Sequence, residues 1–332
     1  MEGALIGVDV GGTKLSVAAL EDGSLGPVDT APTETMSSEL LVEQIVAAVE
    51  RVGEGRAAAV GVGVPSAVEF ASGRARASVN VPLRDVPLRT ILRERLGVRC
   101  YVDNDANCAA LAEAHEGDRL VTRELVMLTV GTGVGGGLVL GGRPYRGATG
   151  AAGELGHMIV GASLRDGAPT PSERFPQPGS LEALARGGAL DDMAATAAHQ
   201  QPDSELGRRA ARGAQVSARD AVEAAHAGDP EGGRLIRLIG ERLGVGVANV
   251  INIFDPEVVA LGGGVSAAGD LLLGPVREMA RRFVLPGVGE RTAVRMSHHG
   301  AVGGLLGAAL LAGQELAEEA PPGEEVVTGT VG

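Results

Sequence analysis

Asp9-Val10-Gly11-Gly12-Thr13-Lys14 is the stretch from which the fold of this 332-residue chain is best inferred. It follows an apolar run over 4–10 and precedes a second one over 15–20, a pattern typical of two strands joined by a tight turn. The glycines let the backbone approach a phosphate, and Asp9 at the strand end can hold hydrated Mg²⁺ through a water. Taken alone, the six residues fit an ordinary hairpin turn better than a phosphate site, so other motifs must decide.

Strands and helices alternate after this hairpin. Apolar spacing predicts a helix over 37–52, a strand over 58–64, a helix over 88–96, a strand over 98–102 and a helix over 106–116. This succession is typical of an α/β lobe. Because the chain is longer than most single domains, we expect two packed lobes with a cleft between them.

A second glycine turn lies in the middle of the chain. The run 125–130 predicts a strand, the turn spans 131–137, and the strand resumes over 138–140. Gly131, Gly133 and Gly136 match the dinucleotide fingerprint, but that motif precedes a helix, so a dehydrogenase is disfavoured. The turn predicts either a loop that wraps a nucleotide phosphate with N–H groups and the Thr132 hydroxyl, or a glycine-rich hairpin without a ligand.

The composition excludes several classes of partner. The chain has 29 Lys and Arg against 42 Asp and Glu, a formal net charge of −13, which argues against nucleic acid or an anionic membrane. Aromatic residues make up 2%, too few for a base-stacking surface. Cys100 and Cys108 lack the spacing of a disulfide framework or a cysteine zinc site. With no signal-like start and no run of 18 apolar residues, we expect a soluble cytoplasmic protein.

Asp103-Asn104-Asp105-Ala106-Asn107 stands where a strand meets a helix start. N-capping explains one of these residues, and a calcium loop fails because Cys108 and Ala114 replace the required Gly and Glu. A third reading has a carboxylate at the strand end that accepts the proton of an attacking sugar hydroxyl. Asp105 is the candidate base, with Asn104 holding a neighbouring hydroxyl.

Further polar groups lie between glycines. Glu154 and His157, in Gly153-Glu154-Leu155-Gly156-His157, suit a polyhydroxylated ligand, although a satisfied surface His is equally compatible. Glu182 starts a helix, where an acid is favourable for the helix dipole in any case.

The C-terminal half is mainly helical after a Pro-, Ser- and Gly-rich loop over 161–179. Ser217 and Asp220 form a capping pair, and Asp229-Pro230 opens a long helix that runs to Ile253. A short strand over 258–261 ends in Gly262-Gly263-Gly264. The acidic stretch 315–332 lacks periodicity and predicts a disordered tail.

Together these motifs resemble the ROK family, which covers repressors and sugar kinases. The specific parts are DVGGTK from Asp9, DNDAN from Asp103, TVGTGVGGGLV from Thr129 and GAAGELGHM from Gly150, and the resemblance runs from Ile6 to about Leu311. It implies an α/β, two-lobed actin-like ATPase (ribonuclease H-like) fold with the active site in the interdomain cleft. The expected division is a small sugar and phosphate lobe over 1–118 joined by a helix over 301–314, a nucleotide lobe over 119–300, and the tail.

The resemblance implies ATP-dependent phosphorylation of a hexose, with glucose the default acceptor. Asp105 is then the catalytic base, and Mg²⁺ is held by Asp9 through a water. The implied sugar-binding residues are Asn80, Asn104, Asp105, Glu154, His157 and Glu182. The implied ATP-binding residues are Gly11, Gly12, Thr13, Lys14, Thr132, Gly133, Gly262, Gly263 and Gly264.

The sequence departs from the family at one site. Many members bind structural zinc through the His of the Gly-His pair and three cysteines, whereas this chain has Phe175-Pro176-Gln177-Pro178-Gly179-Ser180-Leu181-Glu182 there. One His without thiolate partners makes no closed tetrahedral site, so we expect no zinc.

Alternatives remain open at the level of sequence. The acceptor could instead be N-acetylmannosamine, N-acetylglucosamine or fructose, as in other family kinases. The phosphoryl donor could be polyphosphate, which some relatives accept. The chain could also be a non-catalytic regulator that uses the same pocket only to bind a sugar. No helix-turn-helix is expected, because only eight residues precede Asp9. Family members are commonly dimers or tetramers, so we expect a homo-oligomer that binds a small sugar and a nucleotide.

Overall fold

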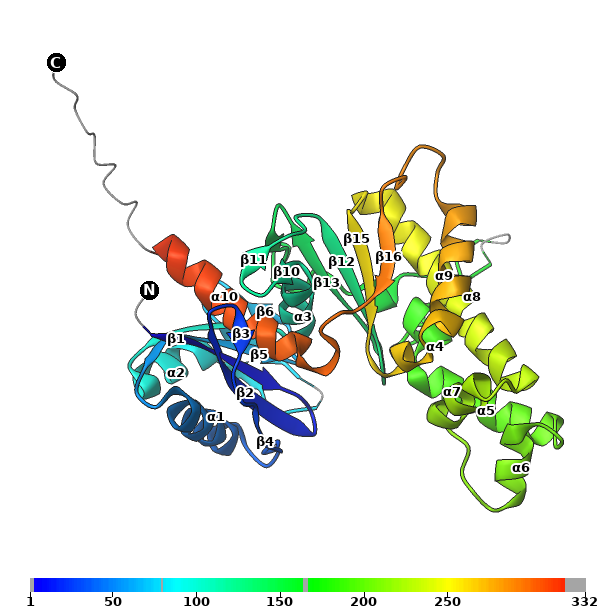
Figure 1. Ribbon diagram of the computed structural model, residues 1–332, viewed down its shortest axis with the longest axis horizontal. Helices are drawn as coiled ribbons and strands as arrows, with labels where there is room; N and C mark the ends of the chain where they lie inside the picture. Colours follow the sequence, from blue (N-terminus) through cyan, green and yellow to red (C-terminus); the bar gives the residue numbers. More distant parts are fainter. Residues whose placement is uncertain (1–2, 79, 164–166, 320–332) are drawn as a thin grey trace. The chain divides into compact units, whose positions relative to one another are not determined.

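The computed structural model describes residues 3–78, 80–163 and 167–319, which belong to two units (Figure 1). Unit 1 comprises the described parts of 1–105 and 305–332, and unit 2 comprises the described parts of 106–304. The chain therefore passes into unit 2 at Ala106, before the expected boundary at 118/119, and leaves it at Gly304, after the expected boundary at 300/301.

Unit 1 is built on a mixed sheet with the order β3-β2-β1-β5-β9, with β4 also paired to β2. β1 is antiparallel to β2 and parallel to β5, which is in turn parallel to β9. These strands confirm the runs predicted over 4–10, 15–20, 58–64 and 98–102. Their bounds are Ala4–Val10 (β1), Lys14–Glu21 (β2), Ser24–Leu25 (β3), Asp29–Pro32 (β4), Ala57–Val64 (β5) and Arg99–Asn104 (β9), and a small separate sheet contains Val68–Glu69 (β6), Arg74–Ala77 (β7) and Arg84–Val86 (β8).

Successive residues of β1 point to opposite faces of this sheet. Ile6 packs in a core with α1 (Ser38–Gly53) and α2 (Leu88–Leu96), the two helices that cover one face. Ser37 caps α1 by accepting a hydrogen bond from Leu40 N at 3.2 Å. Both helices appear where apolar periodicity predicted them.

The opposite face of the unit 1 sheet carries α10 (Gly303–Glu319), which lies directly on two glycines. A Cβ on Gly7 would lie 2.3 Å from Leu305 O, and one on Gly61 would lie 1.8 Å from Ala308 O. Only residues without a side chain allow the helix backbone this close to the strands.

The disordered tail was predicted to begin at residue 315, but the last helix extends beyond that point. α10 continues through 315–319, and the carboxylate of Glu319 lies 3.5 Å from Arg93 Nη2 and 3.2 Å from Arg99 Nε. The acidic run was wrongly predicted as unstructured there, because its basic partners lie far away in the sequence. The remainder of that prediction, 320–332, lies outside the described residues.

One stretch of the described chain, Gly300–Glu319, is long and apolar enough to cross a membrane by length and composition alone. Within the protein 56% of its apolar window is buried, as in the core helices of soluble proteins. This is weak support for a membrane span.

Unit 2 repeats the strand plan of unit 1. Its sheet has the order β14-β13-β12-β15-β16, in which β12 is antiparallel to β13 and parallel to β15, and β15 is parallel to β16. The strands are Leu125–Val130 (β12), Val134–Leu140 (β13), Arg143–Pro144 (β14), Val258–Gly262 (β15) and Ala293–Met296 (β16), and a separate pair consists of His115–Glu116 (β10) and Arg119–Leu120 (β11).

Helices cover both faces of the unit 2 sheet. α3 (Asp105–Glu113) packs on one face, where a Cβ on Gly137 would lie 2.3 Å from Ala106 O. The main core lies on the other face, against α4 (Leu181–Ala185), α5 (Gly187–Gln200), α6 (Glu205–Ala211), α7 (Ala218–His226), α8 (Pro230–Phe254) and α9 (Asp270–Phe283).

The two long helices α8 and α9 lie side by side (Figure 1). Cβ atoms on Gly240 and Gly244 of α8 would lie within 2.9 Å of Pro275 and Met279 of α9, so glycine permits this close packing. Asp229 caps α8 by accepting from Glu231 N and Gly232 N, and Ser217 forms the predicted capping box with Asp220 on α7. Three 3₁₀ turns complete the unit: Leu155–His157 (η1), Gly264–Ala268 (η2) and Gly300–Val302 (η3).

Candidate active site

The first glycine turn joins β1 to β2 and is held by its neighbours. Gly11 N donates to Lys14 O at 2.9 Å, which closes the turn. Thr33 Oγ1 donates to Gly11 O at 2.7 Å and Thr33 N donates to Thr13 O at 3.1 Å, so a residue that the motif did not reveal anchors the loop from outside. A Cβ on Gly12 would lie 3.0 Å from Cβ of Asn80. Asn80, which is predicted to bind the sugar, therefore lies against the turn.

Asp9 lies near the carboxyl end of β1. Burial raises the pKa of its carboxyl group, and the nearby charge of Lys14 partly offsets that rise. Among the described residues the Asp9 carboxylate has no hydrogen-bond or ion-pair partner. A half-buried carboxylate that is free in this way is suited to a cation from solution.

Asn104 and Asp105 stand at the junction of β9 and α3. The sheet register pairs Asp9 with Gly63 and Gly63 with Asp103, so the first turn and this junction lie at the same edge of the unit 1 sheet. Asn104 Nδ2 donates to Ser66 O at 3.3 Å, and Asp103 Oδ1 accepts from Asn104 N at 2.7 Å. These bonds fix the backbone from which Asp105 projects.

The second glycine turn is shorter than expected. Only Gly131, Thr132 and Gly133 connect the strands, with Gly131 N donating to Gly133 O at 2.9 Å, whereas 135–137 belong to β13. The prediction of a turn through 137 was therefore wrong. The later glycines allow close packing, since a Cβ on Gly136 would lie 2.4 Å from Gly153 O.

Glu182 and α5 hold this turn at its two ends. Glu182 Oε2 accepts a hydrogen bond from Val134 N at 2.8 Å and would lie 2.5 Å from a Cβ on Gly133. Gly187 N donates to Gly131 O at 2.7 Å. Glu182, which is predicted to bind the sugar, is thus hydrogen-bonded at the end of the turn that is predicted to bind phosphate.

Glu154 and His157 flank the 3₁₀ turn η1. Glu154 Oε2 and His157 Nε2 are 3.8 Å apart, and both side chains are partly exposed. Phe175, from the stretch where the family's zinc cysteines would stand, packs edge-on against the His157 ring at 5.4 Å between centroids. In residues 3–78, 80–163 and 167–319, no three His, Cys, Asp or Glu side chains gather as a metal site.

A cavity of about 910 Å³ opens in unit 2 beside the second glycine turn. Thr132 and Gly264, both predicted to contact ATP, line it. Gly262 and Gly263 are not among the lining residues: Gly262 pairs with Thr129 in the sheet, and a Cβ on Gly263 would lie 2.4 Å from Val130 O. The size fits a nucleoside-sized ligand.

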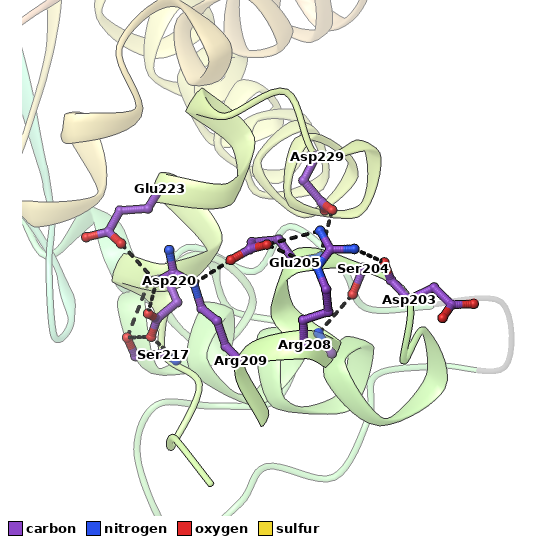
Figure 2. A network of polar contacts seen from close by, with 10 residues as sticks. Asp203, Ser204, Glu205, Arg208, Arg209, Ser217, Asp220, Glu223 and Asp229 are labelled. Carbon is purple, nitrogen blue, oxygen red and sulfur yellow. Dashed lines mark hydrogen bonds and ion pairs between the residues drawn. The ribbon is translucent and has the colours of Figure 1, made fainter. Parts of the chain in front are cut away.

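Helix α7 forms a wall of this cavity that the glycine motifs did not indicate. Its residues Ala218, Arg219, Val222, Glu223 and His226 face the cavity. Arg209 of α6 contacts Asp220 and donates to Glu223 Oε2 at 2.9 Å, in the network that Figure 2 shows. This network holds α7 through Asp220 and through Glu223, which also lines the cavity.

Comparison with known proteins places the chain among sugar kinases. Residues 5–315 match the ROK family. A glucokinase from Halalkalibacterium halodurans (strain ATCC BAA-125) is 32% identical over 318 residues, covering 93% of this chain and 95% of the relative. An N-acetyl-D-glucosamine kinase from Vibrio vulnificus (strain YJ016) is 32% identical over 314 residues, covering 92% of this chain and 98% of the relative.

A solved structure is similar over the same length. The ROK family glucokinase from Streptomyces griseus, in complex with glucose and AMPPNP, is 32% identical, with a TM-score of 0.77. The similarity covers 94% of this chain and 100% of that one.

Proposed function

Because this chain belongs to the ROK family, we propose that it is an ATP-dependent sugar kinase that converts glucose to glucose 6-phosphate. Its fold is the two-lobed actin-like ATPase fold, as the sequence predicted. The observation that most supports the activity is the placement of Asp105 at the end of β9, at the sheet edge that also carries Asp9 and the first glycine turn.

Asp105 acts as the general base in this proposal. Its carboxylate accepts the proton of the sugar 6-hydroxyl while that oxygen forms a bond to the γ-phosphorus, and the bond from phosphorus to the ADP oxygen breaks. The hydrogen bonds of Asn104 to Ser66 and to Asp103 keep the junction rigid, so that the carboxylate is positioned before the sugar binds.

The sugar is held by groups from several loops. Asn80 and Asn104 contribute amides, Glu154 and Glu182 contribute carboxylates, and His157 contributes an imidazole. Glu182 is already oriented by Val134 N, which leaves its second oxygen for a sugar hydroxyl. Glucose is the preferred acceptor in this proposal because the full polar set is present.

ATP phosphates bind at the two glycine turns, through 11–14 and through Thr132 and Gly133, and the adenosine occupies the cavity beside Gly264. The half-buried carboxylate of Asp9, which has no partner among the described residues, fits a hydrated Mg²⁺ ion. Bound there, Mg²⁺ supplies charge neutralisation for the phosphate chain.

No structural zinc is needed in this proposal. Phe175 packs edge-on against the His157 ring, Ile159 pairs with Ser180, and Leu181 N donates to Met158 O at 2.8 Å. These contacts order the start of α4, which carries Glu182. We further propose a cytoplasmic homo-oligomer, a dimer or tetramer, without nucleic acid or membrane as a partner.

A panel of acceptors and donors tests the proposal. Purified protein is assayed with glucose, fructose, N-acetylglucosamine and N-acetylmannosamine, each with ATP or polyphosphate, with and without a chelator. We expect ADP release with glucose and ATP that stops when Mg²⁺ is removed and returns when Mg²⁺ alone is added back. If the enzyme prefers N-acetylglucosamine, that sugar and not glucose is the acceptor. If no sugar leads to ADP release, the kinase proposal is overturned.

A further inference from the structure

Arg186 lies in the wall of the unit 2 cavity, next to the second glycine turn. It directly precedes α5, whose first residue, Gly187, is bonded to Gly131 of the turn. A Cβ on Gly188 would lie 3.6 Å from both Nε and Cζ of Arg186. The guanidinium therefore lies beside the first turn of α5, at the end of the cavity that the glycine turn forms.

This guanidinium has no counter-ion within residues 3–78, 80–163 and 167–319. Its Nε is buried and lacks a hydrogen-bond partner there, and no carboxylate forms an ion pair with it. Arginine stays protonated at physiological pH, and burying an unpaired polar group costs free energy. The residue is therefore suited to an anion that comes from outside the chain.

Three acidic residues line the same cavity, Asp191, Asp192 and Glu223, and none of them forms an ion pair with Arg186 among the described residues. Two of them are bonded to other groups. Asp191 Oδ1 accepts from Ala218 N at 2.6 Å, at the start of α7. Glu223 Oε2 accepts from Arg209 Nη1 at 2.9 Å. The carboxylates of Asp191 and Glu223 thus hold α7.

We infer that Arg186 binds the phosphate chain of the nucleotide, an inference that rests on the proposed nucleotide site. A guanidinium presents a planar set of donors that pairs with two phosphate oxygens at once. The nucleotide then lies with its phosphates towards Gly131 and Arg186 and its nucleoside towards α7. Glu182 and Arg186, one helical turn apart, serve the sugar and the phosphate chain respectively.

Titration calorimetry with two probes tests this role. Arg186→Met is titrated with ADP in Mg²⁺ and, separately, with adenosine, which has no phosphate. The variant should bind ADP about 10- to 100-fold more weakly, as expected for a lost charged hydrogen bond, and adenosine as well as the wild type does. Arg186→Lys should recover part of the loss, because it keeps the charge without the planar fork.

Control variants separate phosphate binding from other effects. Arg282→Met removes an exposed arginine from α9 and should change neither titration. Because the Arg186 guanidinium has no partner in the described part of the chain, Arg186→Met should not lower the melting temperature of the ligand-free protein. Arg219→Met, at a second arginine that lines the cavity, is titrated in the same way. The inference is overturned if Arg186→Met binds ADP as the wild type does, or if it loses as much affinity for adenosine as for ADP. It is also overturned if only Arg219→Met loses affinity for ADP.

Kinetics distinguish this inference from the proposed function. In an active enzyme, Arg186→Met should raise KM for ATP by about 10- to 100-fold and leave KM for glucose unchanged. If the wild type has no kinase activity but binds ADP through Arg186, the proposed function fails and the inference stands. If the wild type is active and the variant matches it in both titration and kinetics, the inference alone fails.

Discussion

At the scale of single residues, Asp9 lies in a site that disfavours the charged form of its carboxyl group. Burial raises the pKa of this carboxyl group despite the nearby Lys14. Ionised Asp9 therefore destabilises the ligand-free fold, and the penalty grows as the pH rises from the ordinary value of 3.8 through the raised pKa. A carboxylate kept at such a cost is typical of a functional site.

Asp9→Asn should accordingly have opposite effects on stability and activity. At pH 7 the ligand-free variant should melt at a higher temperature than the wild type, and the difference should vanish below the ordinary carboxyl pKa. Kinase activity should fall by about 100-fold or more, because the ligand for the metal ion is lost. Differential scanning fluorimetry across pH and a coupled ADP assay measure the two effects.

Asp22→Asn is the matched control, since Asp22 is exposed in the turn between β2 and β3. It should leave both quantities unchanged. A melting temperature for Asp9→Asn below that of the wild type at pH 7 would contradict the account of this carboxylate.

Little of this residue-scale detail is predictable from the sequence. The motifs brought attention to Asn80 and Glu182, but only the structure shows Asn80 against Gly12 and Glu182 bonded to Val134 N. Arg186 gave one signal, a basic residue before a Gly-Gly pair at a helix start. That signal has no meaning until the facing glycine turn is known.

At the scale of elements, the packing of α10 on the unit 1 sheet depends on glycine. Gly61→Ala would place a methyl group 1.8 Å from Ala308 O, so the helix must move. We expect a loss of about 3 kcal/mol in the free energy of unfolding, as for overpacked cores. Urea unfolding monitored by circular dichroism measures it.

Gly274→Ala provides the comparison, because this glycine lies in α9 with open space around it. Alanine favours a helix there and should stabilise the protein by about 0.5–1 kcal/mol. Equal stability of the Gly61→Ala variant and the wild type would mean that α10 does not lie this close to the sheet.

A second element-scale contact ties the end of α3 to the segment after β16. The carboxylate of Glu113 is buried, pairs with Arg295, and accepts from Ser297 Oγ at 2.6 Å, His298 N at 2.9 Å and His299 N at 3.0 Å. Burial alone would raise its pKa, but these hydrogen bonds outweigh burial and lower it. Stability from this group is therefore full above the ordinary pKa of 4.5 and is lost as the pH falls through the lowered value.

Glu113→Gln should destabilise the protein by about 3–5 kcal/mol at pH 7, because Arg295 loses its partner in a buried site. The difference from the wild type should shrink as the pH falls below the ordinary glutamate pKa. Urea unfolding at a series of pH values measures both. Glu116→Gln, at an exposed pair with Arg119, should cost no more than about 1 kcal/mol, and a pH-independent difference for Glu113→Gln would contradict the assignment.

At the scale of the whole molecule, hydrophobic periodicity predicted the central strands of both sheets and the helices α1 and α2, but it predicted neither β14 nor β16 at the edges of the unit 2 sheet. It could not predict which glycines form a turn and which allow close packing within a strand. Residues 135–137 were therefore assigned to a loop, although they belong to β13 and pack against Gly153 and Ala106. It also missed the last turn of α10, whose Glu319 pairs with Arg93 and Arg99. In both cases the deciding contact is distant in sequence.

The central claim, a glucose kinase with Asp105 as its base, is tested most directly by Asp105→Asn. Glucose binding is measured by calorimetry and ADP release by a coupled assay, on the same preparations of variant and wild type. The account predicts that kcat falls by about 10²- to 10⁴-fold while the affinity for glucose stays within a few-fold of the wild type. Turnover of glucose by the variant at the wild-type rate would contradict it.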